Sequence, residues 1–283
     1  MKITVLHESW SAHPLAWIHR AEARSIANEL RHAGHETRFI EFREDRLPEA
    51  SGGPLLLRLS DPVMQVAASA LTNVGKVYLG PAAGIMERCY DKYEAYRVAA
   101  AHGVDCPVTT LAGEAHAIEY PVILKPRRSS DSLGLRLLRK GPMPTYFRTE
   151  NYIAQEFVRG ADLTVAVLRD RVGMPLRLSL PEGVPYSFWR KYLLRPPRSR
   201  VADASLAERV RRTALEIARI FAVNWAARID FILETAADRL RFLECDVVPL
   251  VGARSAFAAS FEAAGLGRAE QLQQLIIQLA GQG

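Results

Sequence analysis

The sequence predicts an α/β protein that is α+β in part, with a small parallel α/β unit over residues 1–84 and two α+β lobes over residues 85–170 and 171–283. Two observations carry this prediction. Strand-like and helix-like segments alternate through residues 1–84, which is typical of a parallel sheet. From about residue 121 onward, short strands with a period of two follow one another between turn residues, which favours antiparallel pairing.

The first unit is expected to hold four strands, at residues 3–6, 37–42, 55–59 and 77–79. A helix with one apolar face separates the first two strands and ends at Gly34, and a second helix spans residues 63–74. Neither GxGxxG nor GxxxxGKS/T follows the first strand, so this unit carries no dinucleotide fingerprint and no P-loop. The apolar run at its start is typical of a buried strand rather than of a signal peptide.

The second part is expected to open with a helical segment through Asp91 that ends near Gly103. Strands should follow at residues 121–124, 153–157, 163–168 and 176–180. Ser205 and Glu208 have the spacing of a capping box and should open a helix with a buried apolar stripe. A last helix closes the chain, with an apolar face formed by Leu272, Leu275, Ile276 and Leu279.

Composition bounds the class of protein and its surroundings. The hydrophobic fraction is 49% and the charged fraction 24%, and no apolar run approaches the roughly 20 residues that a membrane span needs. The three cysteines, Cys89, Cys106 and Cys245, are odd in number and have no CxxC spacing, which argues against a disulfide framework or a zinc site. We therefore expect a cytoplasmic protein without a membrane partner.

Two acid-bearing strands near the C-terminus carry the most informative pattern. Side chains alternate along a strand, so Arg228 and Asp230 should share one face, and Glu244 and Asp246 should share a face of the next strand. Three carboxylates that converge this closely repel one another unless a divalent cation joins them, and oxygen-only ligands favour Mg²⁺ or Mn²⁺. A solvated strand face with a surface salt bridge explains the same residues equally well, so both interpretations stay open on the acids alone.

The net charge of +6 permits an acidic partner, and the densest basic run lies between Arg190 and Arg200. Aromatic residues beside this run could stack on bases, which makes nucleic-acid binding admissible. A solvated loop whose rings pack inward is at least as well supported. A third interpretation gives one or two of these cations to a nucleotide triphosphate.

Lys125 ends an apolar strand and precedes a polar, hydroxyl-rich loop that contains Ser132. A lysine at a strand end beside loop N–H and O–H donors suits phosphate binding. Lys92 is a second cation on a separate segment, and Asp162 could accept hydrogen bonds from ribose hydroxyls. Each of these signals is weak when it is taken alone.

The order of five short segments resembles a known family. They are Asp91-Lys92; Pro121-Val122-Ile123-Leu124-Lys125-Pro126; Gln155-Glu156-Phe157-Val158-Arg159-Gly160-Ala161-Asp162; Lys191-Tyr192; and Arg228-Ile229-Asp230-Phe231 followed by Glu244-Cys245-Asp246. In this order the chain is similar to ATP-grasp ligases of the D-alanine–D-alanine ligase type, from about residue 80 to residue 267. The resemblance implies an ATP-grasp fold in which two α+β lobes grip ATP.

The resemblance also implies roles for individual residues. Lys92, Lys125, Ser132 and Lys191 would contact the ATP phosphates; Glu156 and the backbone near Val158 would hold adenine, and Asp162 the ribose. Asp230, Glu244 and Asp246 would hold two Mg²⁺ (or Mn²⁺) ions. Arg228 and Lys191 would stabilise charge in the transition state, and Ser255 would bind a substrate carboxylate.

The chain departs from the family pattern mainly on the substrate side. Asp246 stands where the family has Asn, Leu250 replaces a Gly, and Asp131 enters the phosphate loop. The family's Gly-Gly turn and its His-Gly loop are also absent, with Glu8 and Arg58 in the segments that replace them. These departures predict a substrate other than D-alanine.

The sequence is compatible with three functions. The favoured one is an ATP-dependent carboxylate–amine ligase that acts on a small amino-acid-like substrate, and the family adds the expectation of a homodimer. The second is an ATP-grasp cyclo-ligase or carboxylate kinase with an intramolecular or non-amine acceptor. The third is a non-catalytic nucleotide- or nucleic-acid-binding module. The retained acids and lysines favour an enzyme and make nucleic acid an unfavoured partner.

Overall fold

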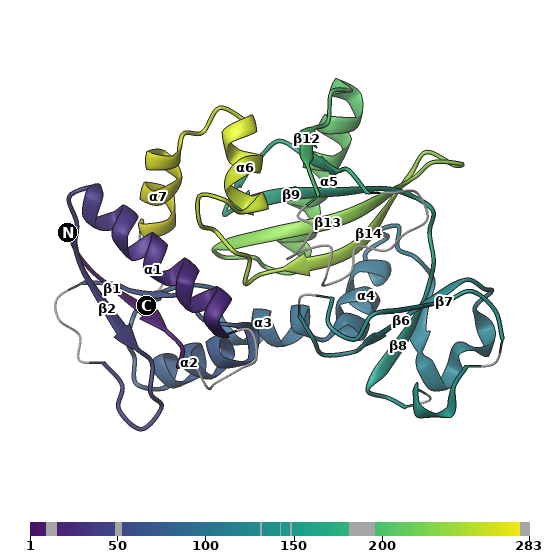
Figure 1. Ribbon diagram of the computed structural model, residues 1–283, viewed down its shortest axis with the longest axis horizontal. Helices are drawn as coiled ribbons and strands as arrows, with labels where there is room; N and C mark the ends of the chain where they lie inside the picture. The colour runs from purple at the N-terminus through teal and green to yellow at the C-terminus, as the bar shows by residue number, and fades with distance from the viewer. Residues whose placement is uncertain are drawn as a thin grey trace.

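Three β-sheets organise the protein, as the computed structural model in Figure 1 shows. The structure describes residues 1–9, 16–48, 53–130, 132–141, 143–147, 149–180 and 196–277; for residues 115–117 it describes the backbone alone. Within these ranges no helix is both long and apolar enough to cross a membrane.

The N-terminal unit is the parallel α/β unit that the sequence predicts. Its strands β1 (Lys2–His7), β2 (Glu36–Glu41), β3 (Leu55–Leu57) and β4 (Tyr78–Leu79) pair in parallel in the order β2-β1-β3-β4. Helices α1 (Ala16–His32) and α2 (Asp61–Asn73) connect them. Gly34 has φ +85°, a left-handed conformation that ends α1 at little cost because glycine has no Cβ.

The helical segment expected through Asp91 is two helices, α3 (Ala83–Tyr90) and α4 (Lys92–Ala101). Asp91 leaves the helical region at φ −81°, ψ 96°, and its carboxylate accepts hydrogen bonds from the amides of Tyr93 and Glu94. An Asp in this position caps a new helix, which explains the break. Lys92 therefore begins a new helix, and its ammonium donates to the carbonyl of Ser129 in the loop after β6.

A small antiparallel sheet forms the central lobe. Its strands β5 (Thr109–Leu111), β8 (Tyr152–Glu156), β6 (Val122–Pro126) and β7 (Arg136–Leu138) follow that spatial order. Two short 3₁₀ helices, η1 (Ala112–Ala117) and η2 (Thr145–Phe147), flank it. Its own small core contains Val122, Leu124 and Ala154, so this lobe has few apolar contacts with which to resist movement.

The large antiparallel sheet has the order β12-β11-β9-β13-β14, with β10 paired to β9. Its strands are β9 (Gly160–Leu168), β10 (Arg171–Val172), β11 (Leu176–Leu178), β12 (Arg198–Arg200), β13 (Ala226–Glu234) and β14 (Arg239–Asp246). We expected the strand at 163–168 to pair with the strands of the central lobe. Instead β9 pairs with β13 along its whole length, while the division of the lobes at residue 170 stays a prediction.

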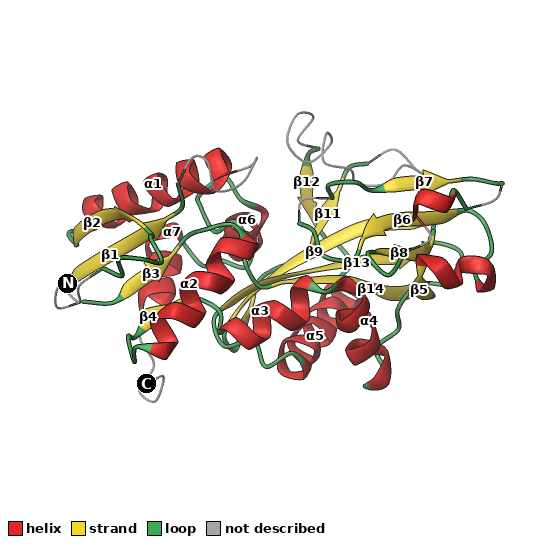
Figure 2. Ribbon diagram, turned by 90° about the horizontal axis from the view of Figure 1, so that it is seen from below, coloured by secondary structure: helices red, strands yellow, loops and turns green. Residues whose placement is uncertain are grey.

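Helices cover one face of the large sheet and leave the other for the site. Figure 2 shows α3, α4 and α5 (Ala204–Ile220) together on one side of β9, β13 and β14. The α5 stripe of Val210, Ala214, Ile217 and Phe221 is buried there, as predicted. Asp203, however, and not Ser205, caps this helix, because its carboxylate accepts from the Leu206 amide at 2.9 Å. Helices α6 (Ala256–Ala263) and α7 (Arg268–Ile276) close the fold; Leu279 lies outside the described residues.

Candidate functional site

The open face of the large sheet presents three rows of side chains in register. Thr164, Asp230 and Glu244 form the middle row, because Asp230 lies opposite Thr164 on β9 and Glu244 on β14. In the row on one side of it, Arg228 of β13 lies opposite Ala166 of β9 and Asp246 of β14. In the row on the other side, beyond an irregularity in the β13–β14 pairing after Asp230, Ile232 lies opposite Asp162 and Arg241. The predicted convergence of Arg228 and the three acids on one face is therefore confirmed.

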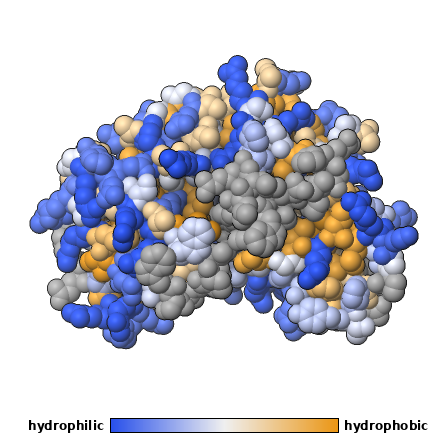
Figure 3. Space-filling model, viewed as in Figure 1, coloured by the Kyte–Doolittle hydropathy of each residue, from blue (hydrophilic) through white to orange (hydrophobic). Residues whose placement is uncertain are grey.

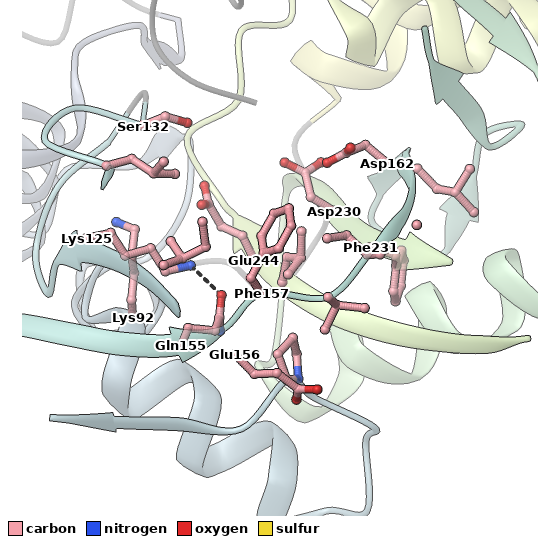
Figure 4. A pocket seen from close by; sticks show the side chains of 18 of the residues that line it. Lys92, Lys125, Ser132, Gln155, Glu156, Phe157, Asp162, Asp230, Phe231 and Glu244 are labelled. Atoms are coloured by element: carbon pink, nitrogen blue, oxygen red, sulfur yellow. Dashed lines mark hydrogen bonds between the residues drawn. The ribbon is translucent and has the colours of Figure 1, made fainter. Parts of the chain in front are cut away.

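A pocket lies over these rows, between the large sheet and the central lobe. Its lining includes eight of the predicted site residues: Lys92, Lys125, Ser132, Glu156, Val158, Asp162, Asp230 and Glu244. Figure 4 shows Lys92 and Lys125 near Glu244, with Asp162 and Asp230 beside each other. In Figure 3, hydrophilic residues predominate at the two ends of this face, and hydrophobic residues lie nearer its middle. The lysines suit phosphate groups, and the acids suit a divalent cation that phosphate oxygens would share.

Lys125, at the end of β6, is held by a chain of hydrogen bonds. Its ammonium donates to Gln155 Oε1 at 3.0 Å, and Gln155 Nε2 donates to the Thr109 hydroxyl at 2.8 Å. Burial and, to a lesser degree, the nearby charge of Lys92 lower the pKa of Lys125 to about 8, and the charge of Glu244 opposes this shift. Gln155 lies in one of the segments that carry the family resemblance, but it is not among the predicted site residues. Its position opposite Ile123 in the β6–β8 ladder became visible only with the strand register.

Lys92 reaches the same pocket from the start of α4. Its ammonium donates to the backbone carbonyl of Ser129, and its amide donates to the Arg127 carbonyl at 3.0 Å. Asp91 is paired with the guanidinium groups of Arg127 at 2.8 Å and Arg128 at 2.7 Å. Burial opposes ionisation of Asp91, but these arginines and the helix amides outweigh it and lower its pKa. Asp91 thus fixes both the helix that carries Lys92 and the start of the phosphate loop.

The loop between β6 and β7 places Ser132 at the mouth of the pocket. Ser132 has φ 58° and Gly134 has φ 74°, so the loop turns sharply through two left-handed residues. A Cβ on Gly134 would lie 2.8 Å from Pro126 Cγ, so glycine allows the loop to fold back on its own strand. The predicted departure at Asp131 lies outside the described residues.

The other end of the pocket is apolar and suits a flat base. Ile123, Leu135, Phe157, Leu178 and Phe231 are among the residues that line it. The Val158 amide also lies here and donates no hydrogen bond to the described part of the chain. A free amide beside an apolar slot is a suitable donor for a base edge, so the prediction for the backbone near Val158 keeps its support.

The carboxylate of Glu156 contacts the junction of the two lobes, and the predicted role of Glu156 in holding adenine stays a prediction. Its carboxylate points away from the pocket in Figure 4, accepts from the Val108 amide at 3.1 Å and pairs with Arg241 at 3.0 Å. Only the backbone of Glu156 is therefore placed to contact a base. The carboxylate pairs with Arg241 because Glu156 lies at the end of β8, where the two lobes meet.

Asp162, on β9, lies beneath the apolar end. Burial, together with the charge of Asp230, raises its pKa to about 7. Its placement in the pocket agrees with the predicted ribose contact, which stays a prediction. Its protonation state changes near neutral pH, so a hydrogen bond from Asp162 would depend on pH.

Arg228 separates two of the three acids. Its guanidinium lies 3.0 Å from Asp230 and 3.2 Å from Asp246, and Thr164 Oγ1 donates to Asp230 at 2.7 Å. Burial lowers the pKa of Arg228, but Asp230 and Asp246 outweigh that effect and raise it. No side-chain hydrogen bond or ion pair joins Glu244 to another residue that the structure describes, so it is the acid most available to a new ligand.

These carboxylates fit a hard divalent cation in the chemistry of their donors but not as a ready-made trio. Within the described ranges, no three His, Cys, Asp or Glu residues are grouped as a metal site. Glu244 and Asp230 lie directly across the β13–β14 ladder from each other, whereas Asp246 is one row away; Arg228 pairs with both Asp230 and Asp246. Glu244 and Asp230 are thus the pair that would hold a cation, and the assignment of all three acids stays a prediction.

A second pocket continues from the first, with Lys92, Ser129 and Glu244 in both linings. It lies between the N-terminal unit and the large sheet. The N-terminal side supplies His19 and Asp61, and the sheet side supplies Arg228, Asp246 and Leu250. A ligand in this pocket would touch Glu244 and Arg228 and would lie next to the phosphate end of the first pocket.

Two residues expected at the substrate side, Ser255 and Arg58, lie elsewhere, and Lys191 is outside the residues that the structure describes. Ser255 lines neither pocket and caps α6, because its hydroxyl accepts from the Ala258 amide at 3.0 Å. Lys191 lies outside the described residues, as does most of the basic run, although Arg198 and Arg200 are exposed on the edge strand β12. Arg58, expected on the substrate side, is fully buried and pairs with Glu22 at 2.6 Å.

Comparison with known proteins agrees with this geometry. An ATP-grasp domain family matches residues 89–184. The D-alanine–D-alanine ligase of Acidiphilium cryptum (strain JF-5) is 28% identical over 254 residues, which is 81% of this chain and 82% of that protein. The D-alanine–D-alanine ligase of Aquifex aeolicus (strain VF5) is 28% identical over 138 residues, and the match spans 46% of this chain and 47% of the relative's length.

Solved structures show the same fold at lower sequence identity. A D-alanine–D-alanine ligase from Bacillus anthracis superimposes with a TM-score of 0.82 at 17% identity and covers 98% of this chain and 96% of that one. The VanG D-Ala:D-Ser ligase from Enterococcus faecalis superimposes with a TM-score of 0.78 at 15% identity, over 97% of this chain and 98% of that one. Residues 89–184 are therefore an ATP-grasp domain, and the chain is similar in sequence and in fold to the D-alanine–D-alanine ligases.

Proposed function

We propose that this protein is an ATP-dependent carboxylate–amine ligase that acts on a small amino-acid-like substrate other than a pair of D-alanines. The observation that carries the proposal is the continuity of the two pockets. Lys92, Lys125 and Glu244 lie around the place for phosphates, and Arg228 lies where that space opens toward the N-terminal unit. A γ-phosphoryl group and an acceptor carboxylate would meet at this junction.

The reaction has two balanced steps. A substrate carboxylate oxygen attacks the γ-phosphorus of ATP, the bond to ADP breaks, and an acyl phosphate forms. An amine then attacks the acyl carbon, inorganic phosphate leaves with the bonding electron pair, and the amine nitrogen loses a proton. The negative charge that develops in both steps is largest on the phosphoryl and carbonyl oxygens.

The residues of the chain have distinct parts in this scheme. Lys125 and Lys92 bind phosphate oxygens and orient the triphosphate, while Arg228 stabilises charge on the acyl group. Glu244 and Asp230 would hold the divalent cation, which supplies neutralisation of phosphate charge when it is bound. Phe157 and Phe231 exclude water from the nucleoside end.

The substrate differs from D-alanine in this proposal because of the wall of the second pocket. His19 and Asp61 come from the N-terminal unit, where the family's own substrate loops are absent, and Tyr90 comes from the end of α3. Asp246 adds a carboxylate in place of the family's amide, and Leu250 replaces a glycine with a larger side chain. Both changes alter the charge and volume next to Arg228.

An ADP-release screen over amino acids of both chiralities, alone and in pairs, tests the proposal. We expect release of ADP and phosphate with one acid and one amine, and a product whose mass is their sum less one water. Turnover with D-alanine alone, at the rate of the best pair, would overturn the substrate assignment. Phosphate release with an acid alone, or a product that lacks the amine, would instead favour a kinase or a cyclo-ligase.

A further inference from the structure

Arg241 lies at the junction of the two lobes, behind the apolar end of the nucleotide pocket. It is on β14, opposite the pocket-lining Ile232 and three residues before Glu244. Its side chain is only 4% exposed. A guanidinium that is buried this deeply needs several negative partners to offset its desolvation.

Three carboxylates from three separate segments provide these partners. Arg241 lies 2.9 Å from Asp105, 3.0 Å from Glu156 and 3.1 Å from Glu234, and it also donates to the Cys106 carbonyl at 2.7 Å. Asp105 and Cys106 lead from α4 into β5, Glu156 ends β8, and Glu234 ends β13. One side chain therefore connects the large sheet to both chain segments through which the central lobe is attached.

The contact with Glu156 extends directly to the nucleotide pocket. The Glu156 amide donates to the Val108 carbonyl at 2.8 Å, and its carboxylate accepts from the Val108 amide at 3.1 Å. Phe157 and Val158 follow at once and line the apolar slot. Arg241 thus limits the movement of the backbone that offers the free Val158 amide to a ligand, without lining the pocket itself.

We propose that Arg241 is a positioning residue for base recognition, which holds the backbone of residues 156–158 where it reads the edge of an adenine. This inference rests on the proposed use of ATP. A backbone donor and acceptor at fixed positions distinguish adenine from guanine, because the two bases carry opposite donor and acceptor groups on that edge. If the strand end moves, this discrimination is lost first, while the phosphate contacts of Lys92 and Lys125 remain.

The test compares the binding of ADP, GDP and inorganic triphosphate by calorimetry. Arg241→Met should weaken ADP binding about tenfold and bring the ADP-to-GDP preference close to one, while triphosphate binding stays as in the natural protein. Arg241→Lys should restore part of the preference. Arg239→Met is the matched control, because Arg239 pairs with the same Glu234 at 2.9 Å but is 51% exposed and has no contact with Glu156. It should change none of the three affinities.

Several outcomes would overturn the inference. A folded Arg241→Met protein with an unchanged ADP-to-GDP preference would do so, and so would an equal loss of ADP and triphosphate binding, which indicates general destabilisation. If Arg241→Met does not fold, Glu156→Gln decides, since it keeps an acceptor for Val108 and removes only the ion pair. Absence of ADP binding by the natural protein would overturn the proposed function as well, whereas ADP binding with unaffected variants overturns the inference alone.

Discussion

The nucleotide half and the substrate half of the site are held together in different ways. In the nucleotide half, the contacts that fix the phosphate-binding lysine lie within one lobe: Lys125 bonds to Gln155 on the neighbouring strand, and Gln155 bonds to Thr109 on the next. In the substrate half, the loop after Asp246 is held by the N-terminal unit. Arg58 donates to the Pro249 carbonyl across 191 positions, and Glu22 accepts from the Gly252 amide across 230.

This difference explains where substrate specificity can change. Lys125, Gln155 and Thr109 lie on three strands of one small sheet, so substitutions elsewhere in the chain should leave the position of the Lys125 ammonium unchanged. The substrate half depends on how two distant parts of the chain dock, so substitutions in either part reshape it. Most departures from the family pattern, though not Asp131 of the phosphate loop, fall on this docked half, which supports the proposed change of substrate.

The largest expected effect is on the contact that joins the two parts. Arg58→Met removes a guanidinium whose side chain is 0% exposed and leaves Glu22, 8% exposed, without its cationic partner. Breaking a buried pair on one side costs about 3–5 kcal/mol, so the midpoint of urea unfolding should fall markedly. A decrease of less than about 1 kcal/mol in the free energy of unfolding would contradict a structural role for Arg58 and would favour the role in substrate binding that the sequence suggested.

Lys125→Met should break the nucleotide half without unfolding the protein. Removing one preorganised cation from a phosphate site costs roughly 10²–10³-fold in rate, and ADP binding should weaken as well. Lys140→Met, at an exposed lysine of the same lobe, is the control and should leave both unchanged. Equal ADP affinity of the Lys125→Met and natural proteins would remove Lys125 from the phosphate site.

The same residue makes nucleotide binding depend on pH. The pKa of Lys125 is about 8, so the lysine is charged below that pH and loses its charge as the pH rises through it. ADP affinity should therefore decline between pH 7 and pH 9 in the natural protein, and this decline should be absent from Lys125→Met. An identical pH profile in both proteins would assign the decline to another group.

The sequence could predict most of the nucleotide half because its chemistry is local. Alternation placed Arg228, Asp230, Glu244 and Asp246 on one face, and the β13–β14 register bears this out. It could not show that Arg228 lies between Asp230 and Asp246, since this depends on rotamers. It also could not assign Glu156 to Arg241 or Arg58 to Glu22, because both pairs form only when separate lobes or units meet.

Asp162 offers a smaller effect that separates burial from function. Its folded pKa of about 7 exceeds the usual value, so the folded state holds a proton there that the unfolded state releases at lower pH. The stability that this proton contributes is fully present below about pH 4 and is lost as the pH rises through 7. Asp162→Asn should therefore stabilise the free protein more at pH 8 than at pH 5, as thermal unfolding at the two pH values would show. A difference that does not vary with pH would mean that Asp162 titrates normally.

The smallest expected effect concerns Ser255, for which sequence and structure point to different roles. As the cap of α6, its hydroxyl satisfies the Ala258 amide, and Ser255→Ala should cost about 1 kcal/mol of folding stability. As a ligand of a substrate carboxylate, its loss would raise the KM for the acid while the KM for ATP stays constant. Ser255→Asp separates the two roles, since aspartate caps helices as well as serine does but repels a carboxylate. If Ser255→Asp is as stable as the natural protein and its KM for the acid is unchanged, Ser255 acts only as the helix cap. Recognition of the substrate would then depend on Arg228 and on the residues that line the second pocket.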